Sequence, residues 1–288
     1  MTDLSGYDLQ ALRSPLIRLA YRMLGSIVDA EDVVQEAFGR WLASDHNAVR
    51  EPAAFLRVIV TRLCLNVMAS ARRNRETYIG PWLPEPVFDP DDADPVDDIT
   101  LPLMIALERL SPLQRAAFLL HDIFGMDFVQ IGEAINRTPA ACRQLASRAR
   151  SDLRQGRPRF PISKAHGDTV AAAFYAASRS GDMKTLRALL TQDVIAVADG
   201  GGKVPASPIP LVGIDAVMAR HAEMAVLFSH EPSRLLRYGR INGLPGFLTI
   251  EGGGVRQTTA LDISGDHVAA IYVTRNPEKL SYATADLN

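Results

Sequence analysis

Apolar residues recur every three or four positions through the first 75 residues, and this spacing predicts three amphipathic helices. The first helix should end at Gly25, because glycine commonly terminates helices. The second should have Asp29 as its N-cap and keep an acidic outer face, and the third should begin at Pro52. The residues expected on the buried faces are Leu9, Leu12, Leu16, Leu19, Ala20 and Met23, then Val34, Phe38 and Trp41, then Phe55, Ile59, Leu63 and Val67.

A helix-turn-helix is predicted in the middle of the chain, from Asp127 to about Gln155. Its first helix has an apolar stripe, and Asn136-Arg137-Thr138 forms the turn. Thr138 should cap the second helix and Pro139 should be its first residue, since proline's missing N–H costs nothing there. The stripe of the first helix is Phe128, Ile131 and Ile135, and the buried face of the second is Cys142, Leu145, Ala149 and Leu153.

The outer face of this second helix is basic and polar, which suits phosphates and base edges of duplex DNA. Between Arg137 and Lys164 there are eight basic residues and one acid, Asp152, although the whole chain has a net charge of −2. Such segregation of charge indicates a DNA footprint. The alternative is an ordinary αα-hairpin with a solvated arginine face.

Residues 79–100 differ in composition from both flanking segments, being rich in proline and aspartate, and they are predicted to form a linker. An acidic linker usually only separates domains. Trp82 is costly in a mere spacer, however, and indicates a docking point. A helix over about 99–110 and another, capped by Ser111-Pro112 and closed by Gly125, should lead into the helix-turn-helix.

Beyond Pro161 the pattern changes to an alanine-rich helix, a short helix and then alternating strands, which predicts an α+β domain. The turn signals are Asn242-Gly243, a run of glycines and Gly265-Asp266. The expected helices are 170–178 and 183–190, and the expected antiparallel strands are 233–238, 246–251, 255–263 and 267–274.

At 288 residues, with 47% hydrophobic and 22% charged residues, the chain can form two or three packed domains. We find no leader pattern at the start and no run of about 20 apolar residues, so no membrane span and a cytoplasmic location are expected. Cys64 and Cys142 are expected to be buried thiols. The sequence contains no motif for a catalytic nucleophile, a metal or a cofactor, and none is expected.

Several motifs together resemble bacterial extracytoplasmic-function (ECF) sigma factors of the sigma-70 family. Residues 21–25 (YRMLG), 29–38 (DAEDVVQEAF) and Trp41 resemble sigma region 2, and residues 110–115 (LSPLQR) with the following helices resemble region 4. Three later motifs resemble the signatures of the sigma-J type, which carries a fused SnoaL-like domain. These motifs are Trp82-Leu83-Pro84-Glu85-Pro86, Asp199-Gly200-Gly201-Gly202-Lys203 and Asn276-Pro277-Glu278-Lys279-Leu280, the last with Glu278 where aspartate is usual.

The resemblance implies four parts: region 2 (1–78), an acidic, proline-rich linker (79–100), region 4 with its helix-turn-helix (101–160) and a SnoaL-like cone-shaped α+β barrel (161–288). It also implies an initiation factor whose partners are core RNA polymerase, through the β′ clamp helices and the β flap, and promoter DNA. The residues that would bind the polymerase are Asp29, Glu31, Asp32, Gln35 and Glu36. Without the resemblance, they would be a solvated face favoured by the helix dipole.

Two DNA sites are implied by the same resemblance. Region 2 would capture a flipped base and contact the freed strand of the −10 element, while region 4 would read the −35 duplex in its major groove. The −10 candidates are Ser44, Arg50, Arg57, Arg62, Asn66, Arg72 and Arg73. The −35 candidates are Arg137, Thr138, Ala140, Arg143, Gln144, Ser147 and Arg148, with Arg143 and Gln144 on base edges. The basic end of the third helix also suits the helix dipole without any DNA.

The C-terminal domain should regulate the sigma regions in cis, docking near residues 82–86, with residues 276–280 touching region 2. It is also a candidate to bind a small-molecule ligand. His221, Asp199 and Lys203 could form an acid/base set, but residues 199–203 are more simply a mobile glycine-rich turn.

Two alternatives stay open. One is a SnoaL-like enzyme or sensor tethered to a DNA-binding module, and the other is a dimeric helix-turn-helix regulator, for which the acidic helix would have no purpose.

Overall fold

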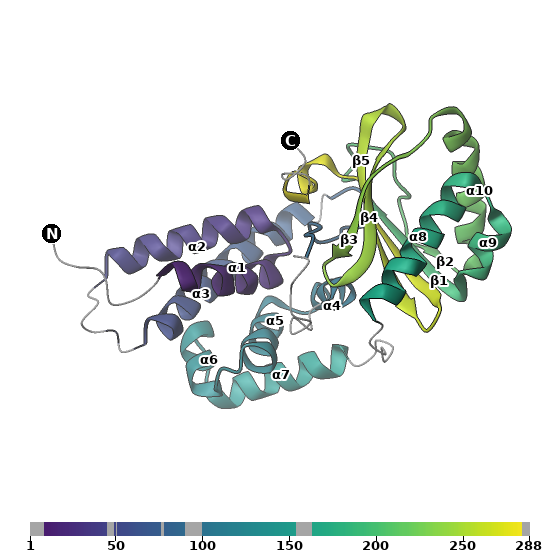
Figure 1. The fold of residues 1–288 in the computed structure, drawn as a ribbon. Coiled ribbons are helices and arrows are strands. Elements are labelled where there is room, and N and C mark those ends of the chain that lie inside the picture. Colours follow the sequence, from purple (N-terminus) through teal and green to yellow (C-terminus); the bar gives the residue numbers. More distant parts are fainter. Residues whose placement is uncertain are drawn as a thin grey trace. The chain divides into compact units, whose positions relative to one another are not determined.

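The computed structural model describes residues 9–44, 49, 51–75, 78–89, 100–153 and 163–283, with the backbone alone over 71–75. It divides into two compact units (Figure 1). A helical unit contains residues 1–77 and 104–157, and an α+β unit contains residues 78–103 and 158–288. The segment between the two helical parts therefore groups with the C-terminal domain.

The helical unit begins with α1 (Leu9–Leu24), α2 (Ile27–Leu42) and α3 (Pro52–Arg75), as the spacing predicts. The N-cap of α2 is Ser26, whose Oγ accepts a hydrogen bond from the Asp29 amide at 3.2 Å, so the expectation of Asp29 as N-cap was wrong. Asp29 instead lies in the first turn, where its charge is favourable toward the helix dipole.

The buried face of α3 lies one position beyond the predicted one. Phe55 and Ile59 are only half-buried, and Phe55 packs edge-on against Trp41 with ring centroids 5.7 Å apart. Leu63 is buried as predicted, and the other buried apolar side chains of the helix are Leu56, Val60, Cys64 and Met68. Burial raises the pKa of the Cys64 thiol and keeps it protonated.

Helix α3 is also long and apolar enough to be a membrane-span candidate, over Pro52–Ser70 with a mean hydropathy of 1.5. In this structure it packs against α1 and α2 through its buried face and carries Arg57 and Arg62 on other faces. These features are those of the core helix of a three-helix bundle.

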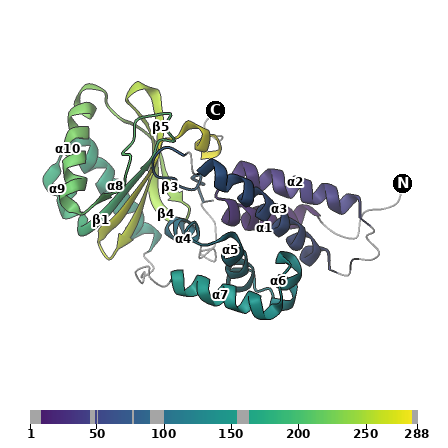
Figure 2. The same ribbon diagram turned by 180° about the vertical axis from the view of Figure 1, so that it is seen from behind.

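The second half of the helical unit begins within α4 (Leu101–Leu107), which is shorter than the predicted 99–110 and has its first three residues in the α+β unit. It continues with α5 (Pro112–Phe118) and a π-helical turn, η2 (Leu119–Ile123). Ser111 caps α5 in a reciprocal capping box with Gln114, as its Ser-Pro start predicts. The helix-turn-helix follows as α6 (Phe128–Ile135) and α7 (Pro139–Leu153), and α7 lies against α5 (Figure 2).

The helix-turn-helix has the predicted turn. Asn136 adopts the left-handed conformation (φ 53°), and the Thr138 hydroxyl accepts from the Ala141 amide at 3.2 Å. Gly132 permits the close approach of the two helices, because a Cβ there would lie 2.6 Å from the Arg137 carbonyl oxygen. On α7, Cys142 and Ala149 are buried as predicted, with Ala146 beside them, whereas Leu145 and Leu153 are half-buried.

A buried arginine connects the two halves of the helical unit. Arg115 on α5 is 2% exposed and donates from Nη1 to the Met23 carbonyl oxygen at 2.7 Å and to Glu108 at 2.6 Å. Burial lowers the pKa of Arg115 to about 10, which leaves it charged at neutral pH. The end of α1 is thereby held to α5.

The α+β unit contains a six-stranded sheet in the order β2-β1-β6-β5-β4-β3, with one face covered by three helices (Figure 1). β1 and β6 are parallel, and the other neighbours are antiparallel. The core between the layers includes Phe174, Leu186, Val217, Phe247 and Ile271. The bounds are α8 Lys164–Ser180, α9 Met183–Ala188, β1 Leu190–Asp199, β2 Leu211–Val212, α10 Ile214–His230, β3 Arg234–Ile241, β4 Leu244–Glu251, β5 Val255–Ser264 and β6 His267–Thr274.

The predicted strands correspond to β3–β6, and Asn242-Gly243 turns with positive φ at both residues (48° and 77°). The expected α+β fold is therefore present. β1, β2 and α10 were not predicted. Helix α10 buries Val217 and Phe228 but exposes Val226 and Leu227, so it lacks the single apolar stripe that periodicity detects.

Candidate polymerase and promoter interfaces and a linker clasp

The acidic face of α2 is open to solvent. Asp29, Asp32, Gln35 and Glu36 are exposed, and Glu31 keeps 42% of its side chain exposed while paired with Arg13 at 3.2 Å. Glu36 pairs with Arg40 one turn later at 2.6 Å. Exposed pairs of this kind contribute little to stability, so these carboxylates can exchange partners readily.

The −10 candidates lie on or next to α3. Asn66 is exposed, Arg57 is half-buried, and the Ser44 hydroxyl donates to the Trp41 carbonyl oxygen at 2.7 Å at the end of α2. Arg72 and Arg73 continue α3, but their side chains lie outside the described residues, as do Arg50 and most of the loop over 44–50.

Arg62 is already engaged within the helical unit. Its Nη2 donates to the Glu133 carbonyl oxygen at 2.7 Å, and its Nε donates to that of Ala134 at 3.3 Å. These carbonyls belong to the last turn of α6, where a cation is favoured by the helix dipole. One of the −10 candidates thus contacts α6, the helix that precedes α7.

The seven −35 candidates share one exposed surface on the turn and the first ten residues of α7. Arg137 donates to the Asn136 carbonyl oxygen at 2.7 Å, and the Arg143 guanidinium lies 5.7 Å from the Phe128 ring centroid. Farther along α7, Arg150 bonds Asp122 at 2.7 Å and Asp152 accepts from Gln114 at 3.1 Å. The last turns of α7 are therefore bonded to α5 and η2, while its first turns are exposed to solvent.

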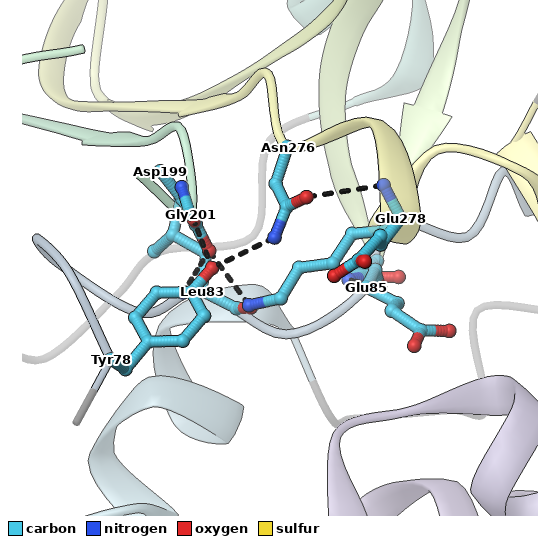
Figure 3. Close-up of polar contacts among 9 residues, drawn as sticks. Tyr78, Leu83, Glu85, Asp199, Gly201, Asn276 and Glu278 are labelled. Atoms are coloured by element: carbon cyan, nitrogen blue, oxygen red, sulfur yellow. Dashed lines mark hydrogen bonds and ion pairs between the residues drawn. The ribbon is translucent and has the colours of Figure 1, made fainter. Parts of the chain in front are cut away.

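In the α+β unit, three motifs far apart in sequence meet in what we call the linker clasp: Tyr78, Leu83, Asp199, Asn276 and Lys279 (Figure 3). Asp199, at the end of β1, is fully buried. Its Oδ1 accepts from the Tyr78 hydroxyl at 2.5 Å, and its Oδ2 accepts from the Leu83 amide at 2.9 Å and from Lys279 Nζ at 2.7 Å.

Lys279 completes the clasp from the other side. Its Nζ donates to the Leu83 carbonyl oxygen at 2.6 Å and lies 4.3 Å from the Trp82 ring centroid, within cation–π range. Asn276 Nδ2 donates to the Tyr78 hydroxyl at 3.0 Å. Burial, and then the bond to Asp199, raise the pKa of Tyr78, so its proton stays in place.

The linker then runs along the β3–β4 hairpin like an added strand. The Val87 amide donates to Asn242 Oδ1 and the Asn242 amide donates to the Val87 carbonyl oxygen, both at 2.9 Å, while Asn242 Nδ2 donates to the Glu85 carbonyl oxygen at 3.2 Å. The Phe88 ring lies 3.7 Å from the Arg237 guanidinium and fills the space left by Gly239, where a Cβ would come within 2.8 Å. The predicted docking of the Trp82 segment on the C-terminal domain is confirmed.

Several residues of these sites were not singled out from sequence: Tyr78, Phe88, Arg115 and Asn242. Asn242 was interpreted only as a turn residue, and the other three carry no local signal of their partners. The 276–280 motif reaches the linker through Asn276 and Lys279, while its expected contact with region 2 stays a prediction.

The acid/base set considered from sequence is not assembled. Asp199 is occupied in the clasp, and Lys203 pairs with Glu278 at the surface. His221 lies apart from them in a cavity of the same unit, where burial, then Arg179 and Arg220, lower its pKa to about 4. Asp199 and Gly200 are buried at the start of the turn, while Gly202 and Lys203 are exposed.

Comparisons with known proteins agree with this architecture. The sigma-70 region 2 model matches residues 9–74, and the sigma-70 region 4 model matches residues 101–153. The ECF RNA polymerase sigma factor SigJ of Mycobacterium tuberculosis is 36% identical, over 95% of this chain and 92% of its own length. The chain belongs to the ECF sigma factors. The probable ECF sigma factor SigI of the same species is 35% identical, over 96% and 95% of the two chains.

The crystal structure of M. tuberculosis SigJ matches this ECF sigma factor with a TM-score of 0.76 and 34% identity, covering 95% of this chain and 97% of that one. Helices α1–α3 therefore form sigma region 2, and α4–α7 form region 4. The protein is a transcription initiation factor that directs RNA polymerase to promoters.

Proposed function

We propose that this ECF sigma factor binds the β′ clamp helices of core polymerase through the acidic face of α2. The exposure of Asp29, Asp32 and Glu36 supports this assignment, because exposed carboxylates can steer and orient docking on a basic partner, and the exposed Gln35 adds an amide to the same face. Region 4 would contact the β flap. The factor would act in the cytoplasm, where core polymerase transcribes.

Region 2 would capture a flipped base of the −10 element in the loop over 44–50 and contact the freed strand through α3. Region 4 would place α7 in the major groove of the −35 element, with Arg143 and Gln144 on base edges. Arg137, Ser147 and Arg148 would contact phosphates and set the register of α7 on the duplex. The common exposure of these residues supports a role of this surface in binding DNA.

Regions 2 and 4 would be unable to contact the −10 and −35 elements at the same time while the helical unit keeps its present form. The two elements lie about 25 base pairs apart, roughly 85 Å at about 3.4 Å per base pair. Arg62 on α3, however, is bonded to the end of α6, and Arg115 ties α5 to α1. Regions 2 and 4 would therefore separate before initiation, and the present form would be a closed one.

The linker clasp would control this separation, and it is the observation that carries the proposal of regulation in cis. Tyr78 is bonded to Asp199, and the Leu101 amide donates to the Asn242 carbonyl oxygen at 2.8 Å. Both ends of the linker are thus held on one domain. Released and extended, the same stretch would span roughly 80 Å at about 3.3 Å per residue, which is the reach that the promoter demands.

Run-off transcription with purified core polymerase tests the proposal. Lys279→Met removes the cation that bonds both Asp199 and Leu83, and it should raise transcription from a cognate promoter several-fold. Deleting the residues after Thr274 should act in the same direction. The matched control is Lys203→Gln, which breaks the neighbouring surface pair with Glu278 and should leave transcription unchanged. Equal transcription by the Lys279→Met variant and the natural chain would reject regulation through the clasp.

We propose no catalytic role for the C-terminal domain. Its candidate acid/base residues are separated, with Asp199 and Lys203 each engaged elsewhere. A tethered enzyme would instead turn over a substrate irrespective of polymerase. That outcome would favour the alternative of a SnoaL-like enzyme joined to a DNA-binding module.

A further inference from the structure

A cavity of about 100 Å³ lies inside the α+β unit, lined by residues of α8, α10 and the sheet. Its walls combine apolar side chains such as Phe174 and Ile271 with the cationic side chains of Arg179, Arg220 and Arg275. None of the described residues that line it is aspartate or glutamate. Neither the clasp nor the promoter interfaces use this space.

The positive charge around the cavity is only partly neutralised. Arg179 donates to the buried Glu251 at 2.6 Å, and Arg220 pairs with the exposed Glu223 at 2.9 Å. Arg275 donates to the Pro205 carbonyl oxygen at 2.7 Å. Within the described residues, Arg179 Nε, Arg275 Nε and His221 Nδ1 are buried at the cavity without a hydrogen-bond partner, as is Oε2 of Glu251, which does not line the cavity. Such a site favours an anion with several acceptor oxygens.

The size of the cavity limits the rest of the ligand. A dry apolar cavity of about 150 Å³ in another protein holds benzene. This cavity is smaller, so a ligand here should have an apolar body smaller than a ring, such as a chain of about two or three carbons, beside Phe174 and Ile271. Together these features describe a compact carboxylate.

The cavity and the linker clasp share two stretches of backbone. Ala198 lines the cavity and Asp199 is the next residue; Arg275 lines the cavity and Asn276 is the next residue. The amides of Arg275 and Asn276 both donate to the Asp199 carbonyl oxygen, at 2.8 and 3.0 Å. A ligand that draws the Arg275 guanidinium away from Pro205 would shift the backbone that positions the clasp.

We propose that this cavity binds a small carboxylate with a compact apolar body, and that Arg275 transmits its binding to the clasp and loosens the linker. The ligand site stands on the cavity alone, whereas its effect on transcription rests on the proposed regulation in cis. A metabolite acid would then act as the inducer of this sigma factor.

Binding is tested on the full chain by calorimetry with acetate, propionate and butyrate, each compared with its uncharged amide. At least one acid should bind tenfold or more tightly than its amide. Arg220→Gln should weaken that acid about tenfold and leave the amide unchanged. The matched control is Arg187→Gln, which breaks a surface pair with Asp215 outside the cavity and should leave the affinity unchanged. No preference for any acid, or equal losses in both variants, would overturn the site.

Coupling is tested by hydrogen exchange at the Leu83 and Val87 amides, which bond Asp199 and Asn242. Saturating the chain with the acid that binds should speed their exchange several-fold. Unchanged or slower exchange would overturn the coupling. The Lys279→Met transcription assay needs no ligand, so failure of the ligand site and failure of regulation in cis are distinguishable.

Discussion

Asp199 and Lys279 form a buried ion pair across 80 residues of sequence, with Nζ 2.7 Å from Oδ2 and side-chain exposures of 0% and 9%. Both partners also bond the backbone of Leu83: the Asp199 carboxylate accepts from the Leu83 amide, and Lys279 Nζ donates to the Leu83 carbonyl oxygen. The pair thus holds the backbone of the linker from both sides. A buried pair of this kind contributes specificity more than net stability, but it is costly to break from one side.

Lys279→Met should therefore lower the free energy of unfolding of the α+β unit by about 3 kcal/mol, because it leaves the Asp199 carboxylate buried and uncompensated. Urea unfolding measures the loss. Adding Asp199→Asn should recover part of it, since the uncompensated charge is then gone. Lys203→Gln should change stability by less than about 0.5 kcal/mol, as expected for an exposed pair. A Lys279→Met loss no larger than that of Lys203→Gln would contradict a structural role for the pair.

Gly132→Ala should destabilise the helix-turn-helix by about 1–3 kcal/mol, because the new Cβ would lie 2.6 Å from the Arg137 backbone oxygen, which cannot move without opening the turn. Thermal unfolding followed by circular dichroism measures this. Gly39→Ala in α2 is the control: a Cβ there meets nothing within 4 Å, so it should be neutral or stabilise by up to about 1 kcal/mol. The steric argument fails if both variants behave alike.

Arg148→Ala and Gln144→Ala should differ in kind. Arg148→Ala removes a phosphate contact, so it should weaken binding to all −35 sequences similarly and reduce the slope of log affinity against log salt concentration by about one. Gln144→Ala removes a base contact, so it should change the preference among −35 sequences. Fluorescence anisotropy on a set of −35 duplexes at several salt concentrations separates the two. Matching effects of both variants on every duplex would contradict the assignment.

Acid should destabilise the α+β unit through His221, whose pKa in the folded chain is about 4. The unfolded chain, with a histidine pKa near 6.5, binds a proton that the folded chain excludes, so stability rises with pH across this window. Between pH 7.5 and pH 5 the folded state should lose about 2 kcal/mol through this residue. Urea unfolding at the two pH values tests this, since His221→Gln should remove that part of the loss. An equal loss in the variant would assign it to other groups.

How much of this structure can be predicted from the sequence depends on how far apart along the chain the interacting residues lie. The helix-turn-helix was predicted closely, with its start at Asp127, Thr138 as a cap and Asn136 in the turn, because caps and turns involve neighbours within three or four residues. The β3–β4 turn at Asn242-Gly243 was predicted for the same reason. The start of α2 was misplaced because both Ser26 and Asp29 satisfy the local rule for an N-cap.

Sequence by itself determined the local elements of this sigma factor, its basic recognition helix and the motifs at residues 82–86, 199–203 and 276–280. Only the tertiary structure decided which of these groups meet: Asp199 with Lys279 rather than His221, Arg62 with the end of α6, and Asn242 with the linker. The physical reason is that a buried hydrogen bond or ion pair depends on where the chain returns in space, and no periodicity along the chain records that position.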